Sequence, residues 1–172
     1  MVTSPETYLL DRDQEHELLV KCWMTHDAMW FYHCTQKLGI ESANQLNLSA
    51  VRGTATFEAL RIYKAFGRRD VKTFEDVKEY LTRGLSLFAA DFMGFNLSFP
   101  AHNIFRWEVP NCFVFQGVNK LGLISQYQCG VIERCKTWLD TLGVKYALTP
   151  ENQGCQKLKT NGCVWEFRFE LE

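Results

Sequence analysis

The clearest pattern in the chain is a strict alternation that runs from Cys163 to Leu171. Every second residue there is apolar: Cys163, Trp165, Phe167, Phe169 and Leu171. Three of the four residues between them carry a charge. A period of two is typical of a β-strand that buries one face and exposes the other. Such a strand needs a neighbouring strand and a layer over its apolar face, so the chain must build a sheet that is covered on one side.

The first half of the chain has the three- to four-residue period of helices instead. We expect a first helix from about Glu15 to Leu38, ended by Gly39, and a second from Ser49 to Phe66. Thr73 and Asp76 have the spacing of a capping box, which predicts the start of a third helix. This part of the sequence therefore favours a layer of helices.

Beyond residue 95 the pattern is mixed. It predicts strands at Asn103–Val109, Cys112–Gln116 and Val144–Leu148, and a fourth helix at Leu123–Leu142. Together with the strand at the end of the chain, these segments indicate an α+β fold. We expect an N-terminal helical layer packed on an antiparallel sheet with one long inserted helix.

Length and composition narrow the class of protein. The 172 residues fit a single domain, with a helical part at about 15–92 and a sheet-containing part at about 95–172. A formal net charge of −1 without a basic stripe argues against nucleic acid as a partner. There is no apolar run of membrane-spanning length, and the polar, acidic start from Met1 to Glu17 is unlike a signal peptide. These features predict a cytoplasmic protein that does not bind membranes.

Cysteines on separate predicted elements of the C-terminal half indicate a metal site. In the reducing cytoplasm, cysteines point to metal binding, reactivity or burial before disulfides. Zinc takes about four thiolate, imidazole or carboxylate ligands in tetrahedral geometry, and this predicts a structural zinc site. Cys129 falls in the first turns of the predicted fourth helix, where the helix dipole and free amides favour a thiolate. The predicted ligands are Cys112, Cys129, Cys155 and Cys163, with Glu151 as the alternative to Cys112 for the fourth position.

Two other interpretations of these four cysteines are buried free thiols and redox-active or catalytic thiols. The remaining cysteines, Cys22, Cys34 and Cys135, lie on helical patterns and are expected in the core.

The stretch from Cys129 to Cys163 resembles the 4-vinyl reductase domain family, small-molecule-binding domains that also serve as sensor modules of aromatic-responsive bacterial regulators. The resemblance implies that Cys129, Cys155 and Cys163 bind zinc from a helix, a loop and the last strand. The family's fourth ligand is a glutamate three residues before the loop cysteine, where this chain has Asn152 and places Glu151 one residue earlier. The resemblance also implies that the chain forms a homodimer.

Over nearly its full length the chain also resembles a family of small bacterial cytosolic proteins of unknown function. The resembling segments are WMTHDAMW from Trp23, YQCGVIER from Tyr127 and GCVWEF from Gly162. That family is distantly similar to a group named for an aminothiazoline-carboxylate hydrolase, which implies a hydrolase of small cyclic substrates as an alternative activity.

A second group of candidates lies on the first predicted helix. His26, Trp30 and His33 are spaced i, i+4 and i+7, so they share one helical face, and Asp27 is adjacent. Imidazoles and a carboxylate can hydrogen-bond the polar head of a small organic molecule while indole rings pack against its body. Glu58 on the second helix and Trp107 on the first strand are further candidate ligand-binding residues.

Several interpretations of this face remain open. The histidines could be core residues with satisfied hydrogen bonds, or His26 and Asp27 an acid–base pair of a hydrolase, or the aromatic surface an oligomer interface. The sequence contains no nucleophile elbow, phosphate loop, dinucleotide fingerprint or metalloprotease motif, so we assign no catalytic residue. The favoured interpretation is a small-molecule-binding domain, of the sensor or carrier type, with a structural zinc and an aromatic-lined pocket.

Overall fold

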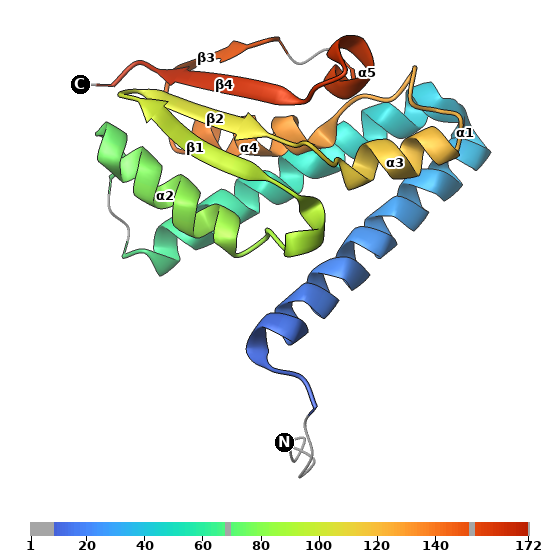
Figure 1. The fold of residues 1–172 in the computed structure, drawn as a ribbon, viewed down its shortest axis with the longest axis horizontal. Helices are drawn as coiled ribbons and strands as arrows, with labels where there is room; N and C mark the ends of the chain where they lie inside the picture. The colour runs from blue at the N-terminus through green and yellow to red at the C-terminus, as the bar shows by residue number, and fades with distance from the viewer. Residues whose placement is uncertain (1–8, 68–69, 152–153, 172) are drawn as a thin grey trace.

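The computed structural model describes residues 9–67, 70–151 and 154–171 and confirms the α+β prediction (Figure 1). A long helix and a shorter one come first, and a sheet interrupted by helices follows. The elements in chain order are α1 (Arg12–Ala65), α2 (Phe74–Ser86), the short 3-10 helix η1 (Asp91–Met93), β1 (Asn96–Ala101), β2 (Ile104–Glu108), α3 (Phe113–Lys120), α4 (Gly130–Thr141), β3 (Tyr146–Thr149), α5 (Gln156–Thr160) and β4 (Val164–Phe169).

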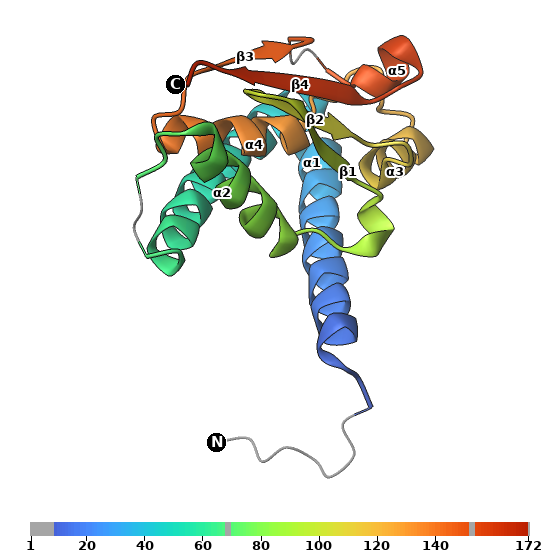
Figure 2. The ribbon, with the colours of Figure 1, turned by 60° about the vertical axis from the view of Figure 1, so that its left-hand side comes forward.

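The sheet is antiparallel with the strand order β1-β2-β4-β3. The predicted alternating strand at the end of the chain is β4, and it pairs with β2 so that Trp107 faces Trp165 and Phe105 faces Phe167. All four side chains are buried. The helices α2 and α4 and the later part of α1 cover this aromatic face, as Figures 1 and 2 show. The alternation therefore marked the face of the sheet on which the core is built.

Helix α1 consists of two arms joined at Gly39. This glycine has φ 81° and ψ 162°, which is not a helical conformation and strongly favours a residue without a Cβ atom. The first arm (residues 12–38) projects from the body of the protein, whereas the second arm (residues 40–65) runs beneath the sheet beside α4 (Figure 2). The predicted break at Gly39 is confirmed, but the second helix starts directly after it rather than at Ser49.

The predicted strand Cys112–Gln116 is wrong, because this segment opens α3. The Cys112 side chain caps the helix, with its Sγ accepting a hydrogen bond from the Phe115 amide at 3.4 Å. The apolar residues after it pack on a small cluster around Val118 and Tyr127 instead of on a neighbouring strand. A short apolar run does not separate helix from strand by its period alone, and here packing decided the outcome.

Two elements were not predicted, and one predicted helix is clearly shorter than expected. Strand β1 was missed because it is an exposed strand at the edge of the sheet with a proline inside it, Pro100, and little alternation. Helix α5 was missed because it is only five residues long. The predicted helix Leu123–Leu142 is shorter, and α4 begins at Gly130, so Cys129 is its N-cap.

The predicted capping box at the start of α2 is confirmed. The Asp76 amide donates to Thr73 Oγ1 at 3.2 Å, and the Thr73 amide donates to Asp76 Oδ2 at 2.8 Å. Replacement of Thr73 by alanine is expected to lower the free energy of unfolding by about 1 kcal/mol, because the first turn loses a side-chain acceptor. Chemical denaturation measures the change. The control is Thr56→Ala in the middle of α1, where Thr56 caps no helix, and it should change stability by less than about 0.5 kcal/mol. Equal effects of the two substitutions would contradict the capping role.

Within the part of the chain that the structure describes, no helix has both the length and the apolar character needed to cross a membrane.

Candidate functional site

A cavity of about 460 Å³ lies between the two arms of α1 and against α4. The first arm contributes aromatic walls from Trp23, Trp30 and Phe31. The second arm contributes mostly small and apolar side chains, among them Ala43, Leu46, Ala50 and Val51. The polar groups at the cavity are few: Asp27, Asn47, Thr54 and Arg134. Apolar walls with a small number of polar groups are typical of small-molecule sites.

Arg134 of α4 is held in place at this cavity by a buried carboxylate. Its Nε donates to Glu58 Oε2 at 2.7 Å, and its Nη2 forms a short hydrogen bond to Glu58 Oε1. Trp138 Nε1 also donates to Glu58 Oε2, at 3.0 Å. The guanidinium carbon lies 4.6 Å from the centroid of the Trp23 ring, within the range of a cation–π contact. Arg134 is therefore fixed by two hydrogen bonds and an indole, and its charge is balanced by Glu58.

The predicted residues of the first helix separate into two groups. Asp27 and Trp30 line the cavity. His26 and His33 do not, and both are exposed, so the interpretation of them as core histidines is wrong. Trp30 Nε1 donates to His26 Nε2 at 3.1 Å, and His26 Nδ1 lies 3.6 Å from Asp27 Oδ1. His26 thus contacts two cavity residues from outside the cavity, while His33 packs against Tyr32.

Glu58 and Trp107 are not on the cavity surface either. Glu58 is 5% exposed and lies beneath Arg134, so it acts on the cavity only through that arginine. Trp107 is buried in the sheet core, with its ring centroid 4.9 Å from that of Phe95. No described residue accepts a hydrogen bond from Trp107 Nε1. The prediction that Trp107 belongs with the histidine–tryptophan face is not supported by its position.

The sequence reasoning missed Arg134. Glu58 gave one indication of such a residue. It lies on a predicted helix, and a glutamate that becomes buried there needs a cationic partner. The pattern did not say which arginine or lysine would supply that charge. The partner is 76 residues away in the sequence and is placed by the packing of α4 on α1.

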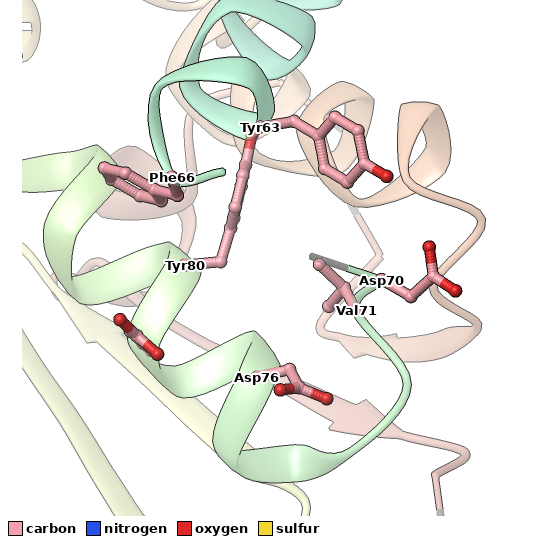
Figure 3. Close-up of a pocket in the computed structure, with 7 residues that line it drawn as sticks. Tyr63, Phe66, Asp70, Val71, Asp76 and Tyr80 are labelled. Atoms are coloured by element: carbon pink, nitrogen blue, oxygen red, sulfur yellow. The ribbon is translucent and has the colours of Figure 1, made fainter. Parts of the chain in front are cut away.

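A second hollow, between the end of α1 and α2, is too small for an organic molecule. Figure 3 shows Tyr63, Phe66 and Tyr80 around it, with acidic side chains at its mouth. Its volume is about 30 Å³, compared with about 460 Å³ for the cavity between the arms of α1. We therefore consider only the cavity between the arms of α1 as a ligand site.

The four candidate zinc ligands stand at the ends of different elements. Cys112, Cys129 and Cys155 are the N-caps of α3, α4 and α5, and Cys163 directly precedes β4. None of the seven cysteines, all of which the structure describes, forms a disulfide.

Backbone contacts bring these segments together. The Val109 amide, three residues before Cys112, donates to the carbonyl of Cys163 at 2.8 Å. The ammonium of Lys157, two residues after Cys155, forms a short hydrogen bond to the carbonyl of Pro110. A Cβ atom at Gly154 would lie 3.5 Å from the carbonyl of Tyr127, two residues before Cys129. The fold thus gathers at one end of the sheet the four segments that the sequence kept apart.

Burial is the largest influence on the pKa of three of these thiols, those of Cys112, Cys129 and Cys163. It raises the pKa of Cys129 to about 12, and the neighbouring Cys112 and Cys163 raise it further, although the amides of Ile132 and Val131 act in the opposite direction. Burial also raises the pKa of Cys112 and of Cys163. The amides at the start of α4 thus favour the Cys129 thiolate, as expected, but desolvation has the larger and opposite effect on its pKa.

Several of these cysteines interact electrostatically with one another. Across residues 9–67, 70–151 and 154–171, no group of three or more His, Cys, Asp and Glu side chains is arranged to hold a metal ion. Cys112 is partly buried and within electrostatic range of Cys155 and Cys163. Glu151 is exposed, and the neighbouring position 152 lies outside the described residues. The zinc site and its fourth ligand stay predictions. The partly buried position of Cys112 near the other cysteines favours it over the exposed Glu151 as the fourth ligand.

The other three cysteines have different surroundings. Cys135 is buried in the core, as predicted. Cys34 is half-buried at the cavity. Cys22 is exposed on the first arm of α1, so its prediction as a core residue is wrong.

Comparison of the chain with protein-family models, curated proteins and solved structures found no match. Its class is therefore described from its geometry: it is an α+β protein with an aromatic-walled cavity beside a bent helix. The resemblances inferred from its segments stay predictions.

Proposed function

We propose that the protein is a small-molecule-binding domain, of the sensor or carrier type, and that its ligand occupies the cavity between the arms of α1. The observation that carries this proposal is the cavity itself. Its volume of about 460 Å³ is within the range of about 300–1,000 Å³ that is usual for small-molecule pockets. Its walls combine tryptophan and aliphatic side chains with an arginine that is already held in position.

The charges around the cavity indicate the kind of ligand. The charge of Arg134 is balanced by Glu58, so it offers a fixed hydrogen-bond donor rather than net positive charge. Asp27 adds a carboxylate, and the indoles of Trp23 and Trp30 line the cavity. Indole rings attract cations, as the contact of Trp23 with Arg134 illustrates. We therefore expect a ligand with an apolar body and a neutral or cationic head.

Filling the cavity tests this proposal. The neutral fluorescent dye N-phenyl-1-naphthylamine should brighten on binding to the unmodified protein, because its fluorescence rises in apolar surroundings. The substitution Ala50→Trp places an indole in the cavity and should weaken dye binding by at least about tenfold, because the ligand volume is lost. A fluorescence titration measures the effect.

The matched control is Ala65→Trp, which adds the same side chain at an exposed position at the end of α1. This variant should bind the dye as the unmodified protein does. Equal dye binding by both variants, or no binding by the unmodified protein, would contradict the proposal that this cavity binds ligands.

We also propose that Cys112, Cys129, Cys155 and Cys163 bind one structural zinc ion. Four sulfur ligands from four segments suit zinc, and a closed site of this kind has no open position for chemistry. Two donors already point at sulfur, since the Phe115 amide and Trp165 Nε1 lie 3.4 Å from the Sγ atoms of Cys112 and Cys163. The ion would link the starts of α3, α4 and α5 to β4. The reduced thiols are also compatible with the proposed cytoplasmic location.

No specific observation favours the hydrolase alternative. His26, the candidate acid–base residue, is exposed and is not among the residues that line the cavity. Its neighbour Asp27 lies 3.6 Å from the His26 ring, and both side chains are largely exposed to solvent.

A further inference from the structure

Arg134 brings to the cavity hydrogen-bond donors that the rest of the described chain does not use. A guanidinium carries several N–H donors and no acceptor. Glu58 accepts hydrogen bonds from two of the three nitrogens of this group, Nε and Nη2. Among the described residues, none accepts a hydrogen bond from the third nitrogen, Nη1. Because Arg134 lines the cavity, Nη1 is the donor left for a ligand.

The surroundings of Arg134 leave one edge of its guanidinium open. The buried carboxylate of Glu58 occupies the edge that carries Nε. The rings of Trp23 and Phe88 lie against the group, with centroids 4.6 Å and 5.0 Å from its central carbon. The edge that carries Nη1 is therefore the part left to border the cavity. The side chain is 24% exposed, so this edge is only partly hydrated.

The charge around the cavity disfavours an anionic partner for Nη1. Two carboxylates, Asp27 at the cavity and Glu58 beneath Arg134, outnumber the one guanidinium. A carboxylate on the ligand would add a third negative charge beside an arginine that Glu58 already neutralises, and like charges placed close together are costly. An acceptor without a charge suits this position, and a carbonyl oxygen is such an acceptor.

We propose that Arg134 selects ligands that carry an uncharged carbonyl group, such as a ketone, an ester or an amide, and that Nη1 donates a hydrogen bond to the carbonyl oxygen. This inference rests on the proposed ligand site, because it assigns one recognition contact within that cavity. A ligand without an acceptor would displace water from Nη1 and leave its N–H groups unpaired. A site built around such a donor rejects the analogue that lacks the acceptor. Arg134 thus determines specificity, whereas the aromatic and aliphatic walls supply general affinity.

A matched pair of ligands tests this role. 2-Acetylnaphthalene and 2-ethylnaphthalene have the same ring and nearly the same shape, but only the first has a carbonyl oxygen. Each compound is titrated against bound N-phenyl-1-naphthylamine, and the ratio of their inhibition constants is measured. Relative to the Glu58→Gln, Arg134→Met double variant, the unmodified protein should favour the ketone by about tenfold or more, because the variant has no charged donor. The double variant leaves no buried charge unpaired.

Arg52→Gln is the matched control. This substitution also removes a guanidinium from a carboxylate between α1 and α4, in the pair of Arg52 with Glu133. Arg52 is not among the residues that line the cavity, so the variant should keep the ketone preference of the unmodified protein.

Infrared difference spectroscopy supplies a measurement that needs no variant. The carbonyl stretch of isotope-labelled 2-acetylnaphthalene, bound to the unmodified protein, should lie at a lower frequency than in hexane, which offers no hydrogen-bond donor. A hydrogen bond from Nη1 weakens the C=O bond, and this shift would be present even if the double variant failed to fold.

The possible failures of this inference and of the proposed ligand site are distinguishable. An equal ratio in the unmodified protein and the double variant, while both bind the dye, would overturn the role of Arg134 and leave the pocket intact. A carbonyl stretch at its hexane frequency, or loss of the preference in Arg52→Gln, would also overturn that role. Tighter binding of 2-naphthoate than of 2-acetylnaphthalene would overturn the assignment of an uncharged acceptor. Absence of dye binding by the unmodified protein would contradict the pocket and this inference together.

Discussion

Replacement of Cys129 by serine is expected to reduce the zinc content of the purified protein from about one ion per chain to nearly none. Cys129 is the N-cap of α4 and is the central member of the proposed site, within electrostatic range of both Cys112 and Cys163. A serine hydroxyl is a poor zinc ligand at neutral pH, and three sulfur atoms hold the ion far less tightly than four. Elemental analysis of protein purified without a chelator gives the stoichiometry.

The same substitution should strongly lower stability. Binding of a structural zinc contributes directly to folding, with apparent values of about 10–16 kcal/mol in small zinc domains. In this larger protein the core of α1, α2, α4 and the sheet remains without the ion. We therefore expect a loss of several kcal/mol rather than complete unfolding, seen as a lower melting temperature of Cys129→Ser and of the chelator-treated protein.

Cys135→Ala is the matched control. Cys135 is in the same helix and is also buried, but it packs in the main core and not beside the other three proposed ligands. This variant should keep its zinc and lose only the packing of one sulfur atom. A metal-free unmodified protein, or a Cys129→Ser variant with full zinc content, would reject the zinc site without affecting the proposed ligand pocket.

Replacement of Glu58 by glutamine is expected to lower the free energy of unfolding by about 3 kcal/mol. Removal of one partner from a buried ion pair leaves the other charge uncompensated, at a cost of about 3–5 kcal/mol. The lower value applies because the Arg134 side chain is 24% exposed and retains some water. The Trp138 indole would also lose the carboxylate that accepts its hydrogen bond.

Chemical denaturation measures this effect, and a double-mutant cycle with Arg134→Met tests its origin. Once Arg134 is absent, loss of the Glu58 charge should cost much less, because no guanidinium remains unpaired. The control is Arg52→Gln, which breaks the more exposed pair between Arg52 and Glu133 and should change stability by less than about 1 kcal/mol. Additive effects of Glu58→Gln and Arg134→Met would show that the two side chains do not act as a pair.

Several elements could be predicted because their signals are local. The two-residue period of β4 follows from the geometry of a single strand. The start of α2 follows from side-chain hydrogen bonds between Thr73 and Asp76, three residues apart. The break in α1 follows from the backbone freedom of Gly39. Each depends on neighbours in sequence, so no knowledge of the rest of the fold was required.

The predictions were wrong where contacts between residues far apart in the sequence decide the local structure. Residues 113–116 are apolar enough for a strand, but they lie over Val118 and Tyr127 and form α3. Trp107 and Trp30 are both tryptophans near polar residues, yet the first is in the sheet core and the second is 63% exposed. The period around each residue gives the face of its own strand or helix, but not which other element packs against that face.

The sequence by itself determined the fold class, the bend in α1 and the residues available for a metal site, because period, glycine and cysteine position act locally. Only the tertiary structure decided what these parts form together. The bend at Gly39 places the two arms of α1 on either side of the cavity. Helix α4 adds Arg134 to its wall, and a glutamate 76 residues earlier holds that arginine in place. Because of the same bend the first arm projects from the sheet, and several of its apolar side chains, among them Leu19 and Trp30, stay exposed. Such outcomes depend on the packing of elements far apart in the chain, and the free energy of that packing is not encoded in any one segment.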